Sequence, residues 1–228
     1  MPRPISSLLV KPSSADCNLA CEYCFYLKKS ALYPDETIHR MSEEVLEAMV
    51  RQVMELRRPN FSFGWQGGEP TLMGIPFYEK AVEFMKRYGG PGQAIGNGLQ
   101  TNGILIDDAW GDFLSEYNFL VGLSLDGPAQ YHNRFRKTRG GGETHARVMQ
   151  TVDTLRRHGV EFNCLVVVNS LNVHDPDGVF DFFMANDLRH LQFIPAIERE
   201  PGGEAGELAD FSPEPEDFGR FMIRIFER

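Results

Sequence analysis

Six short apolar segments, separated by segments of helical character, constrain the fold of this chain more than any other feature. The apolar segments are residues 7–11, 61–65, 95–99, 119–125, 160–168 and 190–194. Several of them are continuously apolar rather than alternating, which is typical of parallel strands covered on both faces. Because parallel strands are joined by right-handed helical crossovers, we expect an α/β fold, a partial (β/α)6 barrel. Six units are too few to close an eight-stranded barrel.

The segments between the strands carry the end signals of helices. The clearest helix is expected at residues 42–58, where Ser42 suits the N-cap and Pro59 follows the last turn. We expect a stripe at helical spacing to face the core; it consists of Val45, Met49, Val53 and Leu56, widened by Leu46, Val50 and Met54. Further helices are expected from residue 76, after 107, over 143–158, after 175–176 and from 218 onward.

The composition excludes several classes of protein. Of the 228 residues, 42% are hydrophobic, which is enough for a core, and the formal net charge is −9. An acidic chain is a poor binder of nucleic acids or anionic membranes. No apolar stretch approaches the roughly 18–20 residues that span a bilayer, and the start of the chain does not read as a signal peptide. We therefore expect a cytoplasmic protein with reduced thiols.

The character of the sequence changes after Ile197. Residues 198–216 are rich in Glu, Gly and Pro, which is typical of a linker or loop, and an amphipathic helical pattern then begins at Phe218. The sequence therefore predicts a barrel domain at residues 1–197, followed at 198–228 by a linker and the start of a helix.

Three of the four cysteines lie together, at Cys17, Cys21 and Cys24. Three thiolates on one short loop can hold three corners of a [4Fe–4S] cubane and leave the fourth iron open to a ligand. A structural zinc site usually has four ligands, commonly from two Cys-x₂-Cys pairs, and no second pair is present. A disulfide would leave one odd thiol and suits the cytosol poorly. Cys164 stands apart in an apolar strand and is expected to be a buried core residue.

The remaining polar motifs follow the ends of the expected strands. They are residues 66–70 (QGGEP), 100–103 (QTNG), 124–128 (SLDGP), 168–170 (VNS) and 195–197 (PAI). In a parallel αβ barrel these ends meet at one face, which is where such barrels carry out chemistry. We assign no role to Asp126, which suits an ordinary Asp-Gly-Pro turn. The six histidines have no ligand partners at a regular spacing and are expected at the surface or at helix ends.

The cysteine spacing CxxxCxxC, with Tyr23 before Cys24, resembles the signature of the radical S-adenosylmethionine (SAM) enzymes. The resemblance implies a TIM-barrel-like core in which the open iron binds SAM and one electron cleaves it to a 5′-deoxyadenosyl radical. It implies that Glu69, within the stretch Gln66, Gly67, Gly68 and Glu69, contacts the SAM amino group. It further implies that Ser124 and Arg136 hold the ribose and carboxylate, and that Tyr26 and Ile197 contact the adenine.

Within that superfamily the chain most resembles the anaerobic sulfatase-maturating enzymes, through residues 21–26 (CEYCFY), 66–72 (QGGEPTL) and 121–128 (VGLSLDGP). The resemblance implies a sulfatase-like peptide or protein substrate whose Cys or Ser is oxidised to formylglycine, and an electron donor such as ferredoxin or flavodoxin. Those enzymes continue into a cysteine-rich SPASM domain with auxiliary clusters, which Cys164 alone could not ligate. Two alternatives stay open: a relative that makes thioether or carbon–carbon crosslinks in peptides, and a non-catalytic iron–sulfur protein that binds SAM.

Overall fold

A single open sheet of six parallel strands forms the centre of the molecule, in a computed structural model that describes residues 5–27, 29–32, 37–198 and 208–228. The strands are β1 (Ser7–Val10), β2 (Asn60–Trp65), β3 (Ala94–Thr101), β4 (Leu120–Ser124), β5 (Phe162–Val168) and β6 (Leu191–Pro195). They lie side by side in chain order, and every neighbouring pair is parallel. The expected half-barrel is confirmed, with strand ends within two residues of the expected ones.

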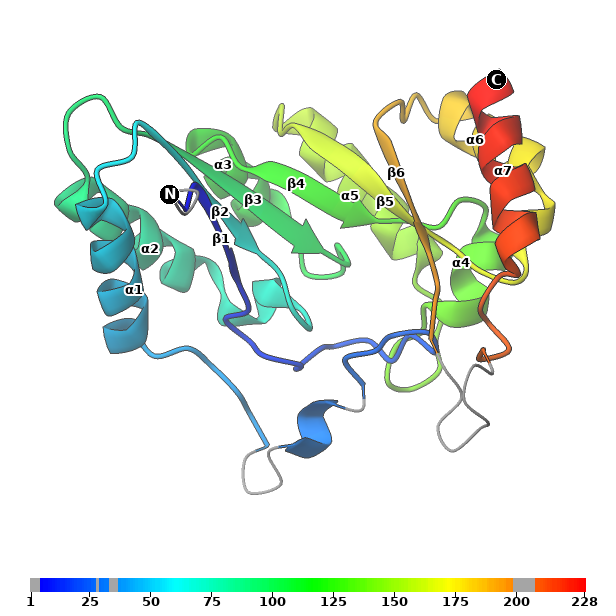
Figure 1. Ribbon diagram of the computed structural model, residues 1–228, viewed down its shortest axis with the longest axis horizontal. Helices are drawn as coiled ribbons and strands as arrows, with labels where there is room; N and C mark the ends of the chain where they lie inside the picture. Colours follow the sequence, from blue (N-terminus) through cyan, green and yellow to red (C-terminus); the bar gives the residue numbers. More distant parts are fainter. Residues whose placement is uncertain (1–4, 28, 33–36, 199–207) are drawn as a thin grey trace.

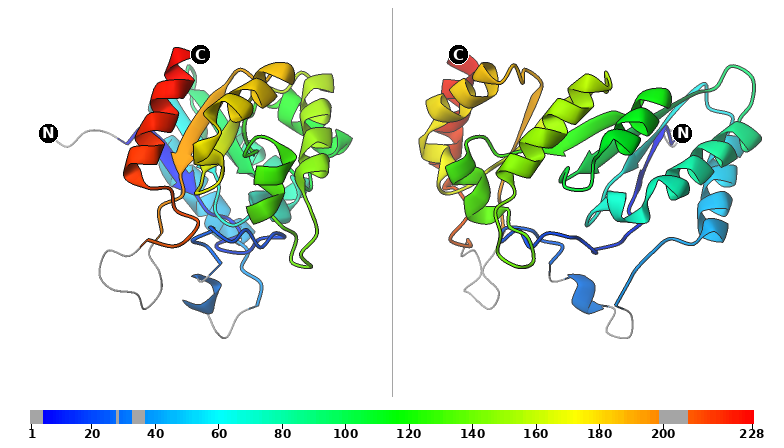
Figure 2. Two further views of the ribbon diagram at one scale, coloured as in Figure 1. Left: turned by 90° about the vertical axis from the view of Figure 1, so that its right-hand side faces the viewer. Right: turned by 180° about the vertical axis from the view of Figure 1, so that it is seen from behind.

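Helices connect the strands along the outer side of the curved sheet (Figures 1 and 2). They are α1 (Glu43–Glu55), α2 (Ile75–Tyr88), α3 (Asp108–Glu116), α4 (Ala129–Phe135), α5 (His145–Arg157), α6 (Pro176–Ala185) and α7 (Pro215–Glu227), with 3₁₀ turns at Lys29–Leu32, Pro70–Met73 and Asn172–His174. The side chain of Ser42 caps α1 as expected, by accepting a hydrogen bond from the backbone N–H of Val45. The short helix α4 was not expected, because seven residues are too few to show a period.

The main core lies between the sheet and the helices, on one face of the sheet. Along β2 the side chains of Phe61, Phe63 and Trp65 are buried, whereas those of the residues between them are not. Across the sheet, Leu9 is 60% exposed and Leu120 is 55% exposed. The expectation that the strands are covered on both faces was therefore wrong for β1, β2 and β4, whereas Cys164, Leu165 and Val166 are buried in succession along β5. A half-barrel has no strands opposite to fill its interior, so its concave face stays accessible.

The buried face of α1 also differs from the expected one. Leu46, Val50 and Met54 are fully buried, whereas Val45 and Leu56 are about half exposed. The sequence offers two overlapping apolar stripes on this helix, and packing against α2 and the sheet decides between them. The stripe that begins at Val45 lies along an outer groove with Ile5 and Leu8 of the β1 segment.

The last helix packs on the barrel. Phe221 of α7 is buried and contacts Phe193 of β6, with 5.4 Å between ring centroids. Residues 199–207 of the expected linker lie outside the described residues, and the domain boundary at 197/198 stays a prediction. A search of the described helices for one long and apolar enough to cross a bilayer found none.

Candidate functional site

The cysteine loop lies across the carboxyl ends of the strands, in the segment between β1 and α1 (Figure 1). Its first half is tied to the loop that follows β2. The backbone N–H of Gly68 donates to the carbonyl of Ser14 at 2.8 Å, and that of Glu69 donates to the carbonyl of Asp16 at 2.6 Å. The Ser13 hydroxyl in turn donates to the Glu69 carbonyl at 3.0 Å. Residues 13–17 and the Gly-Gly-Glu-Pro loop therefore form one bonded unit.

The second half of the cysteine loop pairs with the segment that follows α4. The N–H of Ala20 donates to the carbonyl of Lys137 at 2.8 Å, and that of Glu22 donates to the carbonyl of Phe135 at 3.0 Å. A short antiparallel bridge between residues 19 and 138 continues this register. The loop is therefore held by the ends of two different βα units, although it contains no regular structure itself.

All four cysteines are unpaired thiols, which agrees with the rejection of a disulfide. Burial raises the pKa of Cys17 to about 11 and that of Cys21 to about 12, and both pKa values also respond to the nearby Cys24. Within the described residues, no three Cys, His, Asp or Glu side chains come close enough to hold a single metal ion. In a cubane each thiolate would bind a different iron, so the three sulfurs need not converge on one ion. Iron would also displace the protons that burial favours.

Glu69 is a buried carboxylate held by neutral hydrogen-bond donors. It is 1% exposed. Its Oε1 accepts hydrogen bonds from the N–H and hydroxyl of Thr71 and from the hydroxyl of Thr101, and its Oε2 accepts one from the N–H of Asn102. Burial outweighs these bonds and raises the pKa of Glu69. Across the described part of the chain, no Lys, Arg or His forms an ion pair with it, so an ammonium group would supply the missing charge.

Cys17 and Glu69 are linked through Asn102 at the end of β3. The Asn102 amide donates to Asn18 Oδ1 at 2.8 Å and approaches the Cys17 sulfur at 3.6 Å, and its backbone N–H holds the Glu69 carboxylate. Asn102 was part of an expected strand-end motif, but no role had been assigned to it. Its importance depends on contacts across three loops, which no local pattern reveals.

The backbone of the Gly-Gly-Glu-Pro loop approaches the backbone of residues 14–16 so closely that positions 67 and 68 require glycine. Gly67 has φ +124°, a value that disfavours other residues, and a Cβ on Gly68 would lie 2.0 Å from the Asp16 carbonyl oxygen. We predict that Gly68→Ala separates the two loops and reduces the iron content of the reconstituted protein at least several-fold. Gly219→Ala is the matched control, because a Cβ at that helical position meets nothing within 4 Å. Equal iron content in both variants, measured per folded chain, would contradict this reading.

The other expected SAM-binding residues lie at the same end of the sheet. Ser124 ends β4 and Gln66 follows β2, and both are partly exposed. Tyr26 follows the third cysteine, and its ring lies 5.0 Å from the Lys11 ammonium. Ile197 follows β6 and is 65% exposed. Their exposed surfaces are available to a ligand, but their contacts with SAM stay predictions.

Arg136 is in a different situation, because a buried aspartate already binds it. Its Nε and Nη2 donate to Asp126 at 2.8 and 2.9 Å, and neither residue is more than 7% exposed. Asp126 also accepts hydrogen bonds from the Tyr23 hydroxyl and the N–H of Val167. Asp126, to which the sequence analysis assigned no role, therefore has a structural one. The sequence signal was a carboxylate at a strand end, but its partner lies ten positions away, at no regular spacing.

His132 lies in the last turn of α4, which agrees with the expected surface or helix-end position, but it is not an exposed side chain. His132 is fully buried, accepts a hydrogen bond at Nδ1 from the N–H of Asp126, and contacts the Thr144 hydroxyl through Nε2. Burial lowers the pKa of His132 to about 3, so it is neutral and acts as a fixed hydrogen-bonding group. Its hydrogen bond to the Asp126 backbone holds the turn that carries Asp126.

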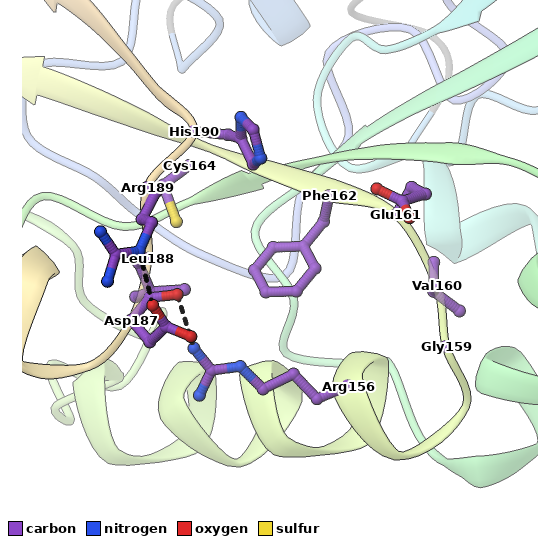
Figure 3. Close-up of a pocket in the computed structure, with 10 residues that line it drawn as sticks. All are labelled: Arg156, Gly159, Val160, Glu161, Phe162, Cys164, Asp187, Leu188, Arg189 and His190. Atoms are coloured by element: carbon purple, nitrogen blue, oxygen red, sulfur yellow. Dashed lines mark hydrogen bonds and ion pairs between the residues drawn. The ribbon is translucent and has the colours of Figure 1, made fainter.

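A separate cavity of about 220 Å³ lies away from this site. Figure 3 shows its lining, which includes Arg156, Phe162, Cys164 and His190. These residues lie at or near the amino ends of β5 and β6, whereas the cysteine loop crosses the carboxyl ends. The Cys164 thiol is 1% exposed, as expected of a core residue, and the cavity brings no catalytic group together.

Comparisons with known proteins agree with this arrangement. The family model described as the radical SAM superfamily matches residues 12–183. The chain is 41% identical to a serine-type anaerobic sulfatase-maturating enzyme of Bacteroides thetaiotaomicron, over 96% of the chain and 56% of the relative, and 41% identical to a cysteine-type enzyme of Clostridium perfringens, over 98% and 60%. A solved structure described as native anSMEcpe with bound AdoMet and Cp18Cys peptide superimposes with a TM-score of 0.88 at 40% identity, covering 98% of this chain and 59% of that one. The chain thus spans less than two thirds of the length of these relatives.

Proposed function

Because the chain belongs to the radical SAM superfamily, we propose that it oxidises a Cys or Ser of a sulfatase-like peptide to formylglycine. The family implies a [4Fe–4S] cluster and SAM, and Cys17, Cys21 and Cys24 are the residues that would hold the cluster. When bound, these groups supply an electron and a cleavable C–S bond, which give a 5′-deoxyadenosyl radical able to abstract hydrogen from the substrate. The observation that carries the proposal is a buried carboxylate, Glu69, that pairs with no cation among the described residues and whose loop is hydrogen-bonded to the loop of the three thiols.

The protein's own part in this chemistry is binding and orientation. Glu69 would pair with the SAM ammonium. The backbone of Gly67 and Gly68 would lie beside the same ligand, and Gln66 would lie at the edge of the ligand site. Ser124 would hold the ribose, and Tyr26 and Ile197 would flank the adenine. Arg136 could reach the carboxylate through Nη1, since its Nε and Nη2 are bound to Asp126.

The choice of sulfatase maturation over peptide crosslinking rests on the relatives. Serine-type and cysteine-type maturating enzymes match this chain at the same 41% identity, so the target residue does not follow from the degree of similarity. Glu69 disfavours the non-catalytic alternative. A purely structural cluster does not need a buried carboxylate whose charge burial destabilises, whereas a bound ammonium group would stabilise that charge. The electron donor, ferredoxin or flavodoxin, and a cytoplasmic location are part of the proposal.

The substrate is tested with two peptides that differ in one atom. The reduced, reconstituted protein is given SAM and a peptide carrying Cys-x-Pro-x-Arg, or the same peptide with Ser in place of Cys. The proposal expects mass spectrometry to find formylglycine in at least one of them, with 5′-deoxyadenosine formed alongside. A thioether or carbon–carbon crosslink in either peptide would support the alternative activity. Cleavage of SAM without any change in either peptide would contradict maturation by this chain.

We predict that Glu69→Gln weakens SAM binding by at least about tenfold, because the neutral amide cannot compensate the ammonium charge in a buried site. Binding is measured by equilibrium dialysis under anoxic conditions on protein with full iron content. Glu79→Gln, on the outer helix α2, removes a carboxylate far from the thiols and is expected to leave the affinity unchanged. If both variants bind SAM like the parent protein, Glu69 does not hold the amino group.

A further inference from the structure

Arg136 lies directly opposite Cys21. The bridge between residues 19 and 138 fixes an antiparallel register, and the hydrogen bonds from Ala20 to Lys137 and from Glu22 to Phe135 continue it on both sides. In this register Cys21 and Arg136 form a pair with no hydrogen bonds between them. Such pairs place the two side chains on the same face, with Cβ atoms about 4.5–5.5 Å apart. The backbone pairing therefore sets the Arg136 side chain on the same face of the paired segments as Cys21.

Two residues that contact each other, Asp126 and Tyr23, fix the guanidinium of Arg136. Asp126 binds its Nε and Nη2, the Tyr23 ring centroid lies 5.5 Å from its central carbon, and the Tyr23 hydroxyl donates to the same carboxylate. A guanidinium stays protonated in proteins, and here a buried carboxylate binds two of its nitrogens. The positive charge is therefore permanent and cannot turn away into solvent.

We propose that Arg136 is a positioning residue that acts through Cys21, where its fixed charge raises the reduction potential of the cluster. The role rests on the proposed function, since it needs a cluster on the three thiols. Reduction adds one electron and makes the cluster more negative, so a nearby fixed cation favours the reduced state. Charge and hydrogen bonding around the thiolates are known levers on such potentials.

Burial distinguishes Arg136 from the other cations of the same segment. Arg134 pairs with Glu22 at 2.6 Å, but these side chains are 48% and 44% exposed, so water and salt screen their charges. Arg136 and Asp126 are 8% and 0% exposed at their side chains. Arg136, unlike Asp126, belongs to the segment that is hydrogen-bonded to the cysteine loop on both sides of Cys21. The positive member of the buried pair is therefore the one that the backbone pairing sets beside the second cysteine.

Neutralising the pair tests this assignment, with the midpoint potential of the reconstituted cluster as the readout. Arg136→Gln is expected to lower the equilibrium constant for reduction at least about tenfold, which is 59 mV for a one-electron couple. Asp126→Asn removes the opposing negative charge and is expected to shift the potential in the opposite direction. The double variant leaves no unpaired charge in the interior, so it is expected to fold and to shift the potential down, by less than Arg136→Gln. Arg136→Lys keeps the charge and is expected to restore most of the potential.

The matched control is Arg134→Gln, which removes an exposed positive charge from the same segment and is expected to change the equilibrium constant less than about twofold. Each potential is measured by an EPR-monitored redox titration on protein with full iron content. If the double variant keeps the parent potential, if Arg136→Lys lowers it as far as Arg136→Gln does, or if Arg136→Gln and Asp126→Asn shift it in the same direction, the inference is wrong. A chain that assembles no cluster would instead refute the proposed function, so the two failures are distinguishable.

Discussion

Replacing Cys21 with alanine is expected to abolish SAM cleavage, to less than about one thousandth of the parent rate. Cys21 is the buried middle thiol of the three, and the flanking residues bond to the segment that follows α4. Without it a cubane would keep only two protein ligands, and no other described cysteine is close, since Cys164 lies in β5. The measurement is 5′-deoxyadenosine formed per chain after anoxic reconstitution and reduction with dithionite.

Cys164→Ala is the matched control for this prediction. It also removes a buried thiol, one with a pKa that burial raises to about 12, but from the core rather than the loop. We expect it to keep the iron content and the cleavage rate, with a loss of stability of about 1 kcal/mol for the small cavity. Wild-type cleavage by Cys21→Ala, or equal losses in both variants, would refute the assignment of the loop cysteines.

Asp126→Ala is expected to destabilise the apoprotein by about 3–5 kcal/mol, because it leaves the Arg136 charge buried and unpaired. Burial alone would raise the pKa of Asp126, but Arg136 together with His132 and Tyr23 lowers that pKa, so the carboxylate is charged in the fold. The substitution also frees the hydroxyl of Tyr23 and the N–H of Val167. For a chain of this size the loss corresponds to a fall in Tm of about 6–20 °C by calorimetry.

The control for the buried pair is an exposed one. Asp108 contacts Arg157 and His158, but its side chain is 69% exposed. Surface ion pairs contribute only about 0–1 kcal/mol, so Asp108→Ala is expected to lower Tm by no more than about 4 °C. Similar falls in Tm for the two variants would mean that the Asp126–Arg136 pair is not a structural anchor.

The sequence predicted the strands and the face that carries the polar motifs, because both depend on local patterns. Six apolar segments with helical connections leave little choice of topology, and parallel strands bring their following loops to one end. The cysteine spacing is equally local. None of these features depends on the register between distant loops.

What the sequence did not predict depends on contacts between distant segments. Asp126 reads as a turn residue until Arg136 folds back on it, and His132 reads as a helix-end histidine until Thr144 and the Asp126 backbone enclose it. The choice between the two apolar stripes of α1 is made by α2. The concave face is exposed because the sheet stays open, and the sequence of a single strand does not show whether a sheet closes.

The proposed cofactor chemistry is tested most directly by anoxic reconstitution of the unmodified chain with iron and sulfide, followed by reduction in the presence of SAM. The account predicts about four irons per chain, an EPR signal of a reduced [4Fe–4S] cluster that changes when SAM is added, and formation of 5′-deoxyadenosine. A folded protein that binds no iron through these three thiols, or one with a reducible cluster whose EPR signal ignores SAM and which never yields 5′-deoxyadenosine, would contradict it.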